Sequence, residues 1–269
     1  MYRLRGRAVA AARATAIATV GLIASQAGVA RAQHAEHDMA AGEHGAGAPA
    51  VSVGVALEAA EFETTYYVGS YQGIAPQLGW THGAFGATAA IGLYHITENG
   101  LSRYGVGDAM LAAHATVISA DALQLGAALH VMCPTGSEID GLGMGHVMVM
   151  PSAWGTWHTD PVAIHASAGY SRGLVSLDGH HHGPMPLVDP MNLQELTWSA
   201  GADVDVGHAV RVGGRTIGAI PIGDGVARVI GAGRVAWGTP RVTTAFELQL
   251  GVAGDPFTIR GVVDTALRF

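Results

Sequence analysis

The chain has no lysine, a single cysteine, few aromatic residues and few charges of either sign. Its 269 residues include 14 basic side chains, all arginine, and only 13% are charged and 6% aromatic. Cys133 has no second cysteine to pair with, so an internal disulfide is excluded. After residue 32 there is no apolar run of about 18 residues, so no later segment is predicted to cross a membrane as a helix.

The first 32 residues have the pattern of a secretory signal peptide. Three arginines within the first seven residues precede an alanine-rich apolar stretch, and Ala30-Arg31-Ala32 has the small-x-small pattern that a signal peptidase cleaves. A membrane-spanning helix is the alternative, and Arg13 inside the apolar stretch disfavours it. We therefore exclude residues 1–32 from the predicted fold.

The remaining chain is acidic. Five of the arginines lie at or before Arg31 and all 21 acidic residues follow it, which leaves nine positive against 21 negative charges, a net charge of −12 with histidine neutral. Such a charge argues against nucleic acid as a partner. Residues 33–50 are rich in Ala, Gly and His without a hydrophobic period, which predicts a disordered His-rich tail. Residues 51–269 contain no later linker and predict one domain.

From residue 51 onward, apolar and polar side chains alternate in segments of about ten residues. Because successive side chains of a strand point to opposite faces, each segment predicts a strand with one apolar and one polar face. In the last segment one face is predicted to carry Phe257, Ile259, Val263, Leu267 and Phe269, and the other Thr258, Arg260, Asp264 and Arg268. The repeated pattern predicts an all-β fold: a single antiparallel transmembrane β-barrel with a polar lumen.

Strand number and orientation follow from the connections. About eleven strands can be counted, with two expected in Val51–Gly79, and the even-number rule then predicts twelve, with ten as the alternative. Short turns are expected at one end, at Ser119–Ala122, Thr159–Pro161 and Thr239-Pro240, and long loops at the other, at Pro134–Gly143 and Ser176–Met191. Short periplasmic turns and long external loops are typical of outer-membrane barrels. With the terminal Phe269, which resembles their assembly signal, this predicts the bacterial outer membrane, with its lipids and the barrel-assembly machinery as partners.

A motif between Tyr104 and Trp157 carries a family resemblance. In order, it consists of Gly105-Val106-Gly107-Asp108, an alternating strand pair, Pro134-Thr135-Gly136-Ser137 and Gly141-Leu142-Gly143-Met144-Gly145. This order resembles the outer-membrane barrel family named after the meta pathway of phenol degradation, and it spans about a fifth of the chain. The resemblance implies a transporter-like barrel with small hydrophobic compounds as suspected cargo. Glycine and Pro-Thr-Gly are turn formers, so we interpret the motif as describing how hairpins are built.

The predicted lumen face is rich in histidine and methionine. The residues on this face are Met110, His114, His130, Met132, His146, Met148, Met150 and His165. A loop repeats the pairing with His180, His181, His182 and Met185, and the tail repeats it with His34, His37, Met39 and His44.

Thioether sulfur and imidazole together suit copper, above all Cu(I). We therefore predict a metal site in the ladder of His114, His130, Met132, His146, Met148 and His165, with the His-rich loop as an external collector and the tail as a periplasmic one. Packing is the alternative, because methionine fills irregular space in any packed lumen. Cys133 has the opposite parity and is predicted to be a strand-end residue rather than a ligand.

Enzymatic functions find little support in the sequence. No Gly-x-Ser-x-Gly elbow, phosphate loop or His-Glu-x-x-His motif occurs, and Ser152 and Ser167 merely share the lumen face with His146 and His165. The sequence predicts a non-enzymatic channel for small-molecule or metal-ion cargo, with no required cofactor and a link to copper. A closed metal-binding barrel and an outer-membrane hydrolase are the alternatives, and no pattern indicates an oligomeric state.

Overall fold

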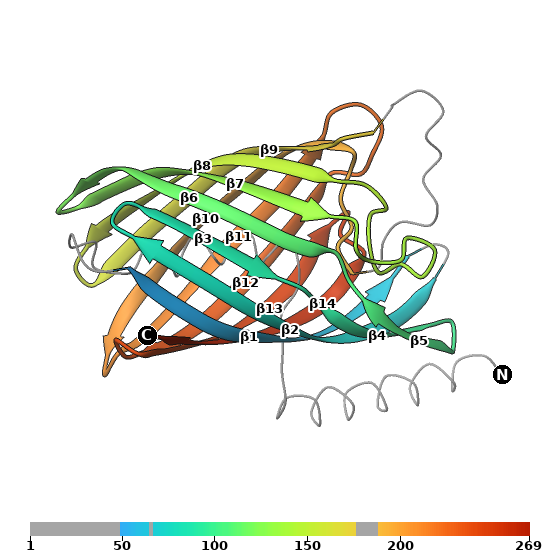
Figure 1. The fold of residues 1–269 in the computed structure, drawn as a ribbon, viewed down its shortest axis with the longest axis horizontal. Helices are drawn as coiled ribbons and strands as arrows, with labels where there is room; N and C mark the ends of the chain where they lie inside the picture. The colour runs from blue at the N-terminus through green and yellow to red at the C-terminus, as the bar shows by residue number, and fades with distance from the viewer. Residues whose placement is uncertain (1–48, 65–66, 176–187) are drawn as a thin grey trace.

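Fourteen β-strands form one antiparallel sheet in the computed structural model, which describes residues 49–64, 67–175 and 188–269 (Figure 1). They are β1 (Ala50–Glu63), β2 (Val68–His82), β3 (Phe85–Ala90), β4 (Leu93–Glu98), β5 (Leu101–Val106), β6 (Ala109–Ala120), β7 (Leu123–Cys133), β8 (Met148–Thr159), β9 (Val162–Gly173), β10 (Gln194–Gly207), β11 (Val210–Pro221), β12 (Arg228–Gly238), β13 (Val242–Ala253) and β14 (Phe257–Arg268). None of the described residues forms a helix long and apolar enough to cross a membrane.

The fourteen segments make twelve barrel strands. The long strand β2 pairs with β1 on one side and with both β3 and β4 on the other, while β6 pairs with β3 and β5 with β4. β3 and β4 are therefore the two halves of one interrupted strand beside β2, broken at Ile91-Gly92, and β5 and β6 are the halves of the next strand along, broken at Gly107-Asp108. The two breaks adjoin, because the Gly107 N–H donates to the Gly92 carbonyl at 2.8 Å. The predicted twelve strands are confirmed, as are the two strands expected in Val51–Gly79.

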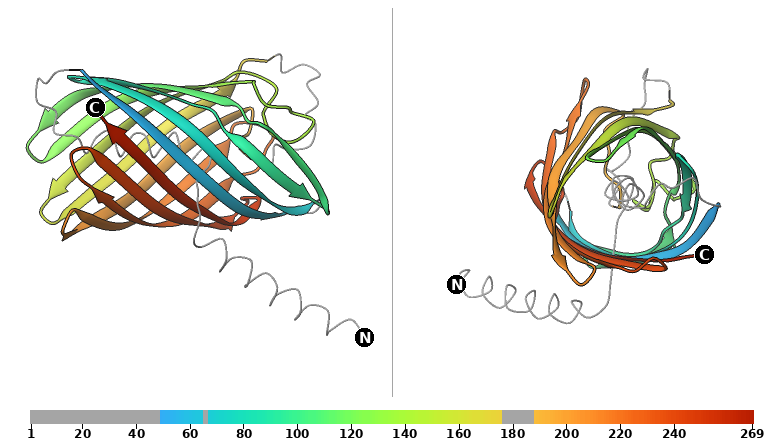
Figure 2. Two further views of the ribbon diagram at one scale, coloured as in Figure 1. Left: turned by 60° about the horizontal axis from the view of Figure 1, so that its bottom comes forward. Right: turned by 90° about the vertical axis from the view of Figure 1, so that its left-hand side faces the viewer.

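The sheet closes because β1 pairs with β14 as well as with β2. Viewed along its axis, the barrel is a ring around a central lumen (Figure 2). Closure pairs each of the other described strands on both sides, which is the condition for spanning a bilayer with strands, while β5 pairs with β4 alone.

The two ends of the barrel differ in their connections. One end carries only short turns, at residues 83–84, 121–122, 160–161, 208–209 and 239–241. The other end carries the long connections 134–147 and 174–193, as the sequence predicts, and the carboxy terminus lies at the short-turn end (Figure 1). We call these the short-turn end and the long-loop end.

The outer face of the barrel is an apolar surface. Side chains that would be buried in a soluble protein are exposed around it, including Leu78, Leu93, Leu111, Leu129, Ile164, Leu196, Phe246 and Leu250. By alternation, the charged side chains that the described strands turn outward are Glu61, Glu63 and Arg172, all near the long-loop end. An apolar band with charges at one rim is the distribution expected of a barrel surrounded by lipid.

Phe257 departs from the predicted faces of the last strand. A register shift between Glu61 and Phe62 pairs Phe62 with Phe257, so an extra residue is accommodated beside β1. One extra residue turns the following side chain to the opposite face. Phe257 is therefore 3% exposed and lies inside the barrel, whereas the sequence pattern placed it outside. That part of the prediction was wrong, because alternation alone does not reveal a bulge.

Candidate functional site

The lumen at the short-turn end is an open, charged chamber, which we call the vestibule. Its volume is about 600 Å³. Six of its lining residues are charged, namely Asp203, Asp205, Asp264, Arg211, Arg234 and Arg268. Three carboxylates and three guanidinium groups balance in sign, so the chamber is strongly polar without a dominant charge.

Buried ion pairs line the wall between the vestibule and the long-loop end. Arg215 Nη2 donates to Glu247 Oε1 at 3.0 Å, and Gln249 Nε2 donates to the same oxygen at 2.7 Å. Arg260 Nη1 donates to Gln249 Oε1 at 3.3 Å, and its guanidinium carbon lies 4.1 Å from the centre of the Phe257 ring. Because a buried charge is costly unless it is paired, these contacts fix the inward side chains of β11, β13 and β14.

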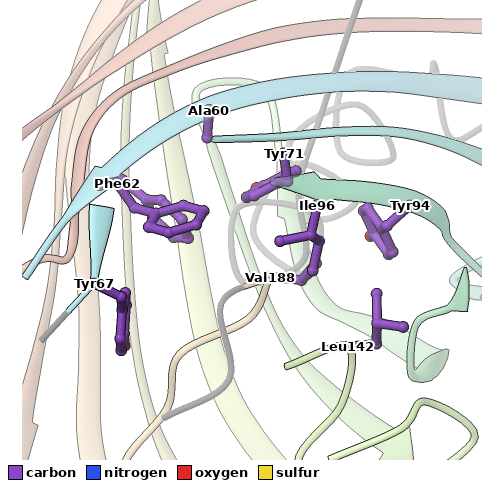
Figure 3. Close-up of a cluster of buried hydrophobic side chains, with 9 residues drawn as sticks. Ala60, Phe62, Tyr67, Tyr71, Tyr94, Ile96, Leu142 and Val188 are labelled. Atoms are coloured by element: carbon purple, nitrogen blue, oxygen red, sulfur yellow. The ribbon is translucent and has the colours of Figure 1, made fainter. Parts of the chain in front are cut away.

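Aromatic side chains fill one side of the lumen toward the long-loop end. This aromatic cluster consists of Ala60, Phe62, Tyr67, Tyr71, Tyr94, Ile96, Leu142, Val188 and Phe257 (Figure 3). The Tyr71 ring meets Tyr94 and Phe257 edge to face, with ring centres 5.8 and 5.6 Å apart. Leu142 and Val188 come from the two long connections, so parts of both loops pack inside the barrel.

Methionine side chains fill another part of this end. The methionine cluster contains Met110, Met132, Met144, Met148 and Met191, with Met150 packed against it. Met110, Met132 and Met148 lie on β6, β7 and β8, whereas Met144 and Met191 belong to the two long loops. The mouth of the barrel is therefore filled by two adjacent apolar groups, each completed by loop residues.

The loop 134–147 is held inward by the residues of the motif. The two oxygens of Asp108 accept N–H groups from Gly136 at 2.9 Å and Met144 at 2.7 Å. Thr135 Oγ1 donates to the Gly107 carbonyl and accepts the Ala109 N–H, both at 2.8 Å. The motif residues therefore hold a long loop against the barrel wall, a role beyond the turn formation that the sequence predicts. We call this contact the Asp108 clasp.

Asp108 is 7% exposed and lies between β5 and β6. The twelve residues of β6 suffice to span a bilayer, so Asp108 lies beyond the spanning segment. The pKa of its carboxyl is raised to about 6, first by burial and also by the charge of Asp189, against the lowering effect of the donated N–H groups.

A second clasp holds the loop 174–193. Arg228 Nη2 donates to both oxygens of Glu195, at 2.8 and 2.9 Å, and Arg228 Nη1 donates to the Pro190 carbonyl. Asn192 Nδ2 donates to Glu195 Oε2 at 2.6 Å and also bonds the backbone of Val226. A single buried ion pair of the wall therefore fixes the described parts of two connections, 188–193 and 222–227. We call it the Glu195–Arg228 clasp.

The structure brings part of the predicted metal ladder together. Met132 pairs directly with Met148, and His130 pairs with Met150 on the next inward row. His146 is buried, and a Cβ placed on Gly173 would lie 2.8 Å from its Nε2. Gly173 pairs with Met148, so His146 lies beside the same row.

Two predicted ladder residues lie elsewhere. His114 pairs with Ala128 rather than with His130, and it lies against Gly86. His165 pairs with Thr156, well toward the short-turn end from Met150, and it lies against Gly201. Among the described residues, no three His, Cys, Asp or Glu side chains are grouped to hold a metal ion. The predicted collectors His180, His181, His182 and Met185, and the tail residues from His34 to His44, fall outside the described residues.

Sequence reasoning missed the loop residues of the site. Met144 and Met191 lie outside the strands, where alternation gives no direction. The sequence predicted no role for Glu195 and Arg228, the charged residues of the second clasp. The Gly-Asp of the motif was the one available signal for the first clasp. Ser167, considered as a nucleophile beside His165, shares a 2.8 Å hydrogen bond with the Ser199 hydroxyl.

Comparison with known proteins yields structural relatives but no family. No family model and no curated protein matches the sequence. An outer-membrane channel from Pseudomonas putida F1 is 13% identical with a TM-score of 0.63, over 85% of this chain and 98% of its own. The translocator domain of the autotransporter NalP from Neisseria meningitidis is 11% identical with a TM-score of 0.54, over 89% and 94%. The KdgM porin is 7% identical with a TM-score of 0.52, over 82% and 99%. At these identities the likeness establishes the outer-membrane barrel fold.

Proposed function

We propose that the protein is a passive outer-membrane channel for small solutes, with the vestibule facing the periplasm and the clasped loops at the external mouth. The observation that carries this proposal is the contrast between the two ends of the lumen. A charged chamber of about 600 Å³ lies at one end, and the other is filled by loops that individual side chains hold in place. Because the loops are held by side-chain contacts and packing and not by strand pairing, releasing them can open the lumen without breaking the barrel.

The likeness to a bacterial channel and a porin supports this proposal, since the solved structures compared are channels, porins and a translocator rather than enzymes. The motif supports the finer assignment to the phenol-degradation barrel family, because its residues build the clasp of the mouth. The aromatic cluster would suit small compounds with an apolar part, as that resemblance implies.

Conductance of the full chain in planar bilayers tests the channel. In the Asp108→Ala variant the Gly136 and Met144 N–H groups lose their acceptors, so we expect longer and larger openings than in the unchanged chain. Asp140→Ala is the matched control, because Asp140 bonds Ser137 within the same loop and has no such contact with the wall. Conductance equal to that of an empty membrane in all three proteins would overturn the proposal in favour of a closed barrel.

A further inference from the structure

The methionines of this chain are not scattered through the barrel. Six of the nine lie within the described residues, and all six belong to the methionine cluster or pack against it. The aromatic cluster at the same end of the lumen contains no methionine. Apolar filling alone does not require this separation, because the other cluster is built mainly from Phe and Tyr side chains with one Leu, one Ile and one Val. The described thioethers are thus concentrated in one part of the lumen.

Three of the six sulfurs come from one inward row. Met110 pairs with Met132, and Met132 pairs with Met148, so these thioethers lie on three adjacent strands at one level. Neighbouring strands lie roughly 4.8 Å apart, which lets ligands at one level converge on a single ion. His130 and Met150 form the adjacent row, and His130 is 3% exposed.

The two clasps bring further thioethers from the loops. The Met144 N–H donates to Asp108, so the Asp108 clasp fixes the backbone that carries this side chain. Met191 lies between Pro190 and Asn192, both of which are bound by the Glu195–Arg228 clasp. Met144 and Met191 are 2% and 3% exposed. Buried charged contacts therefore position the backbone around both methionines, which apolar packing alone would not require.

The donor set determines which ion would fit. Thioethers are soft, neutral ligands that select Cu(I) over Mg²⁺, Ca²⁺ and Zn²⁺, and imidazole is compatible with copper. Because thioether and imidazole ligands are neutral, a bound Cu(I) ion would bring one uncompensated positive charge into a buried space. The carboxyl groups of Asp108 and Asp189, 7% and 8% exposed, lie at the same end and interact with each other.

We propose that the methionine cluster is a Cu(I) site at the loop-closed mouth, with Met110, Met132 and Met148 as wall ligands and Met144 and Met191 as ligands from the loops. His130 and His146 border the site, whereas His114 and His165 of the sequence-predicted ladder lie apart from it. The loops that close the channel thus also complete the ion site. Binding does not require solute passage, so a barrel that conducts nothing would still bind Cu(I).

Anaerobic Cu(I) titration of the full chain in detergent, with a competing chelator and X-ray absorption at the copper edge, tests this site. We expect a sulfur-dominated shell in the unchanged chain. In Met132→Leu plus Met148→Leu the number of sulfur ligands should fall, with an affinity loss beyond the roughly 10–100-fold that loss of an outer-shell partner costs. Leucine keeps the apolar volume, so packing changes little.

The matched control is Met39→Leu plus Met185→Leu, which removes two methionines that are not among the proposed ligands and should leave the sulfur shell unchanged. Heat-dependent gel migration equal to that of the unchanged chain establishes that each variant is folded. A shell of nitrogen and oxygen only in the unchanged chain would overturn the proposal, and so would a sulfur count and an affinity that the cluster substitutions leave unchanged or that fall equally in the control.

Discussion

Asp108 shows how one carboxyl can serve both architecture and response. Each of its oxygens accepts a backbone N–H from the loop 134–147, which a neutral amide could not reproduce, because an amide has one acceptor oxygen. Burial raises the pKa of this carboxyl to about 6. The protonation state of this one residue is therefore coupled to the position of the loop 134–147.

The pH dependence follows from this raised pKa. With the loop released and Asp108 hydrated, its pKa returns toward the ordinary 3.8, so the closed state binds the proton more readily. The extra stability of the closed state is complete below about pH 4 and is lost as the pH rises through about 6. We expect bilayer conductance to increase over this range in the unchanged chain. In Asp108→Asn, which cannot ionise, that increase should be absent, and its persistence there would assign the response to another group.

At the scale of elements, the Glu195–Arg228 clasp links β10 and β12, on either side of β11, to two loops. Removing one charge of a buried pair leaves the other uncompensated at a cost of ~3–5 kcal/mol, whereas removing both is often far milder. We expect Glu195→Gln to lower the temperature at which the barrel loses its folded gel migration. The double variant Glu195→Gln plus Arg228→Gln should recover much of that loss. Additive losses would show that the two side chains do not act as a pair.

The strands were more predictable than the contacts between them. Alternation predicted about eleven strands and their faces, because each strand must turn one side to an apolar exterior and the other to the lumen, and the even-number rule raised the number to twelve. It failed at Phe257, since a bulge is a property of pairing with β1 and leaves no mark in the strand's own sequence. The shared inward face of Met132 and Met148 could be predicted in the same way, because both residues lie on strands predicted by alternation. Met144 and Met191 were not, because loop residues reach the lumen through clasps formed by distant side chains.

At the scale of the whole molecule, the lumen changes character along its axis. The vestibule is charged and open, the middle wall is crossed by ion pairs, and the mouth is filled by apolar side chains from wall and loops. A solute entering from the short-turn end would first meet the charged side chains of the vestibule. It would reach the aromatic and methionine clusters only afterwards. Selectivity for the sign of an ion should therefore reside in the vestibule, away from both clasps.

The balanced vestibule charges predict weak ion selectivity that substitution can bias in either direction. Arg211 and Arg268 are exposed in this chamber, and replacing both by glutamine leaves the three carboxylates in excess. A narrow lumen of low dielectric focuses such a field, so the reversal potential across a salt gradient should shift toward cation preference. Asp205→Asn should shift it toward anions, and the amide oxygen can still accept the Gly207 N–H that Asp205 Oδ1 now accepts at 2.8 Å. Both shifts should shrink at high salt, because screening shortens the reach of each charge. Measured in the Asp108→Ala background, where openings are frequent, identical reversal potentials in all variants would place the selective step in the mouth instead.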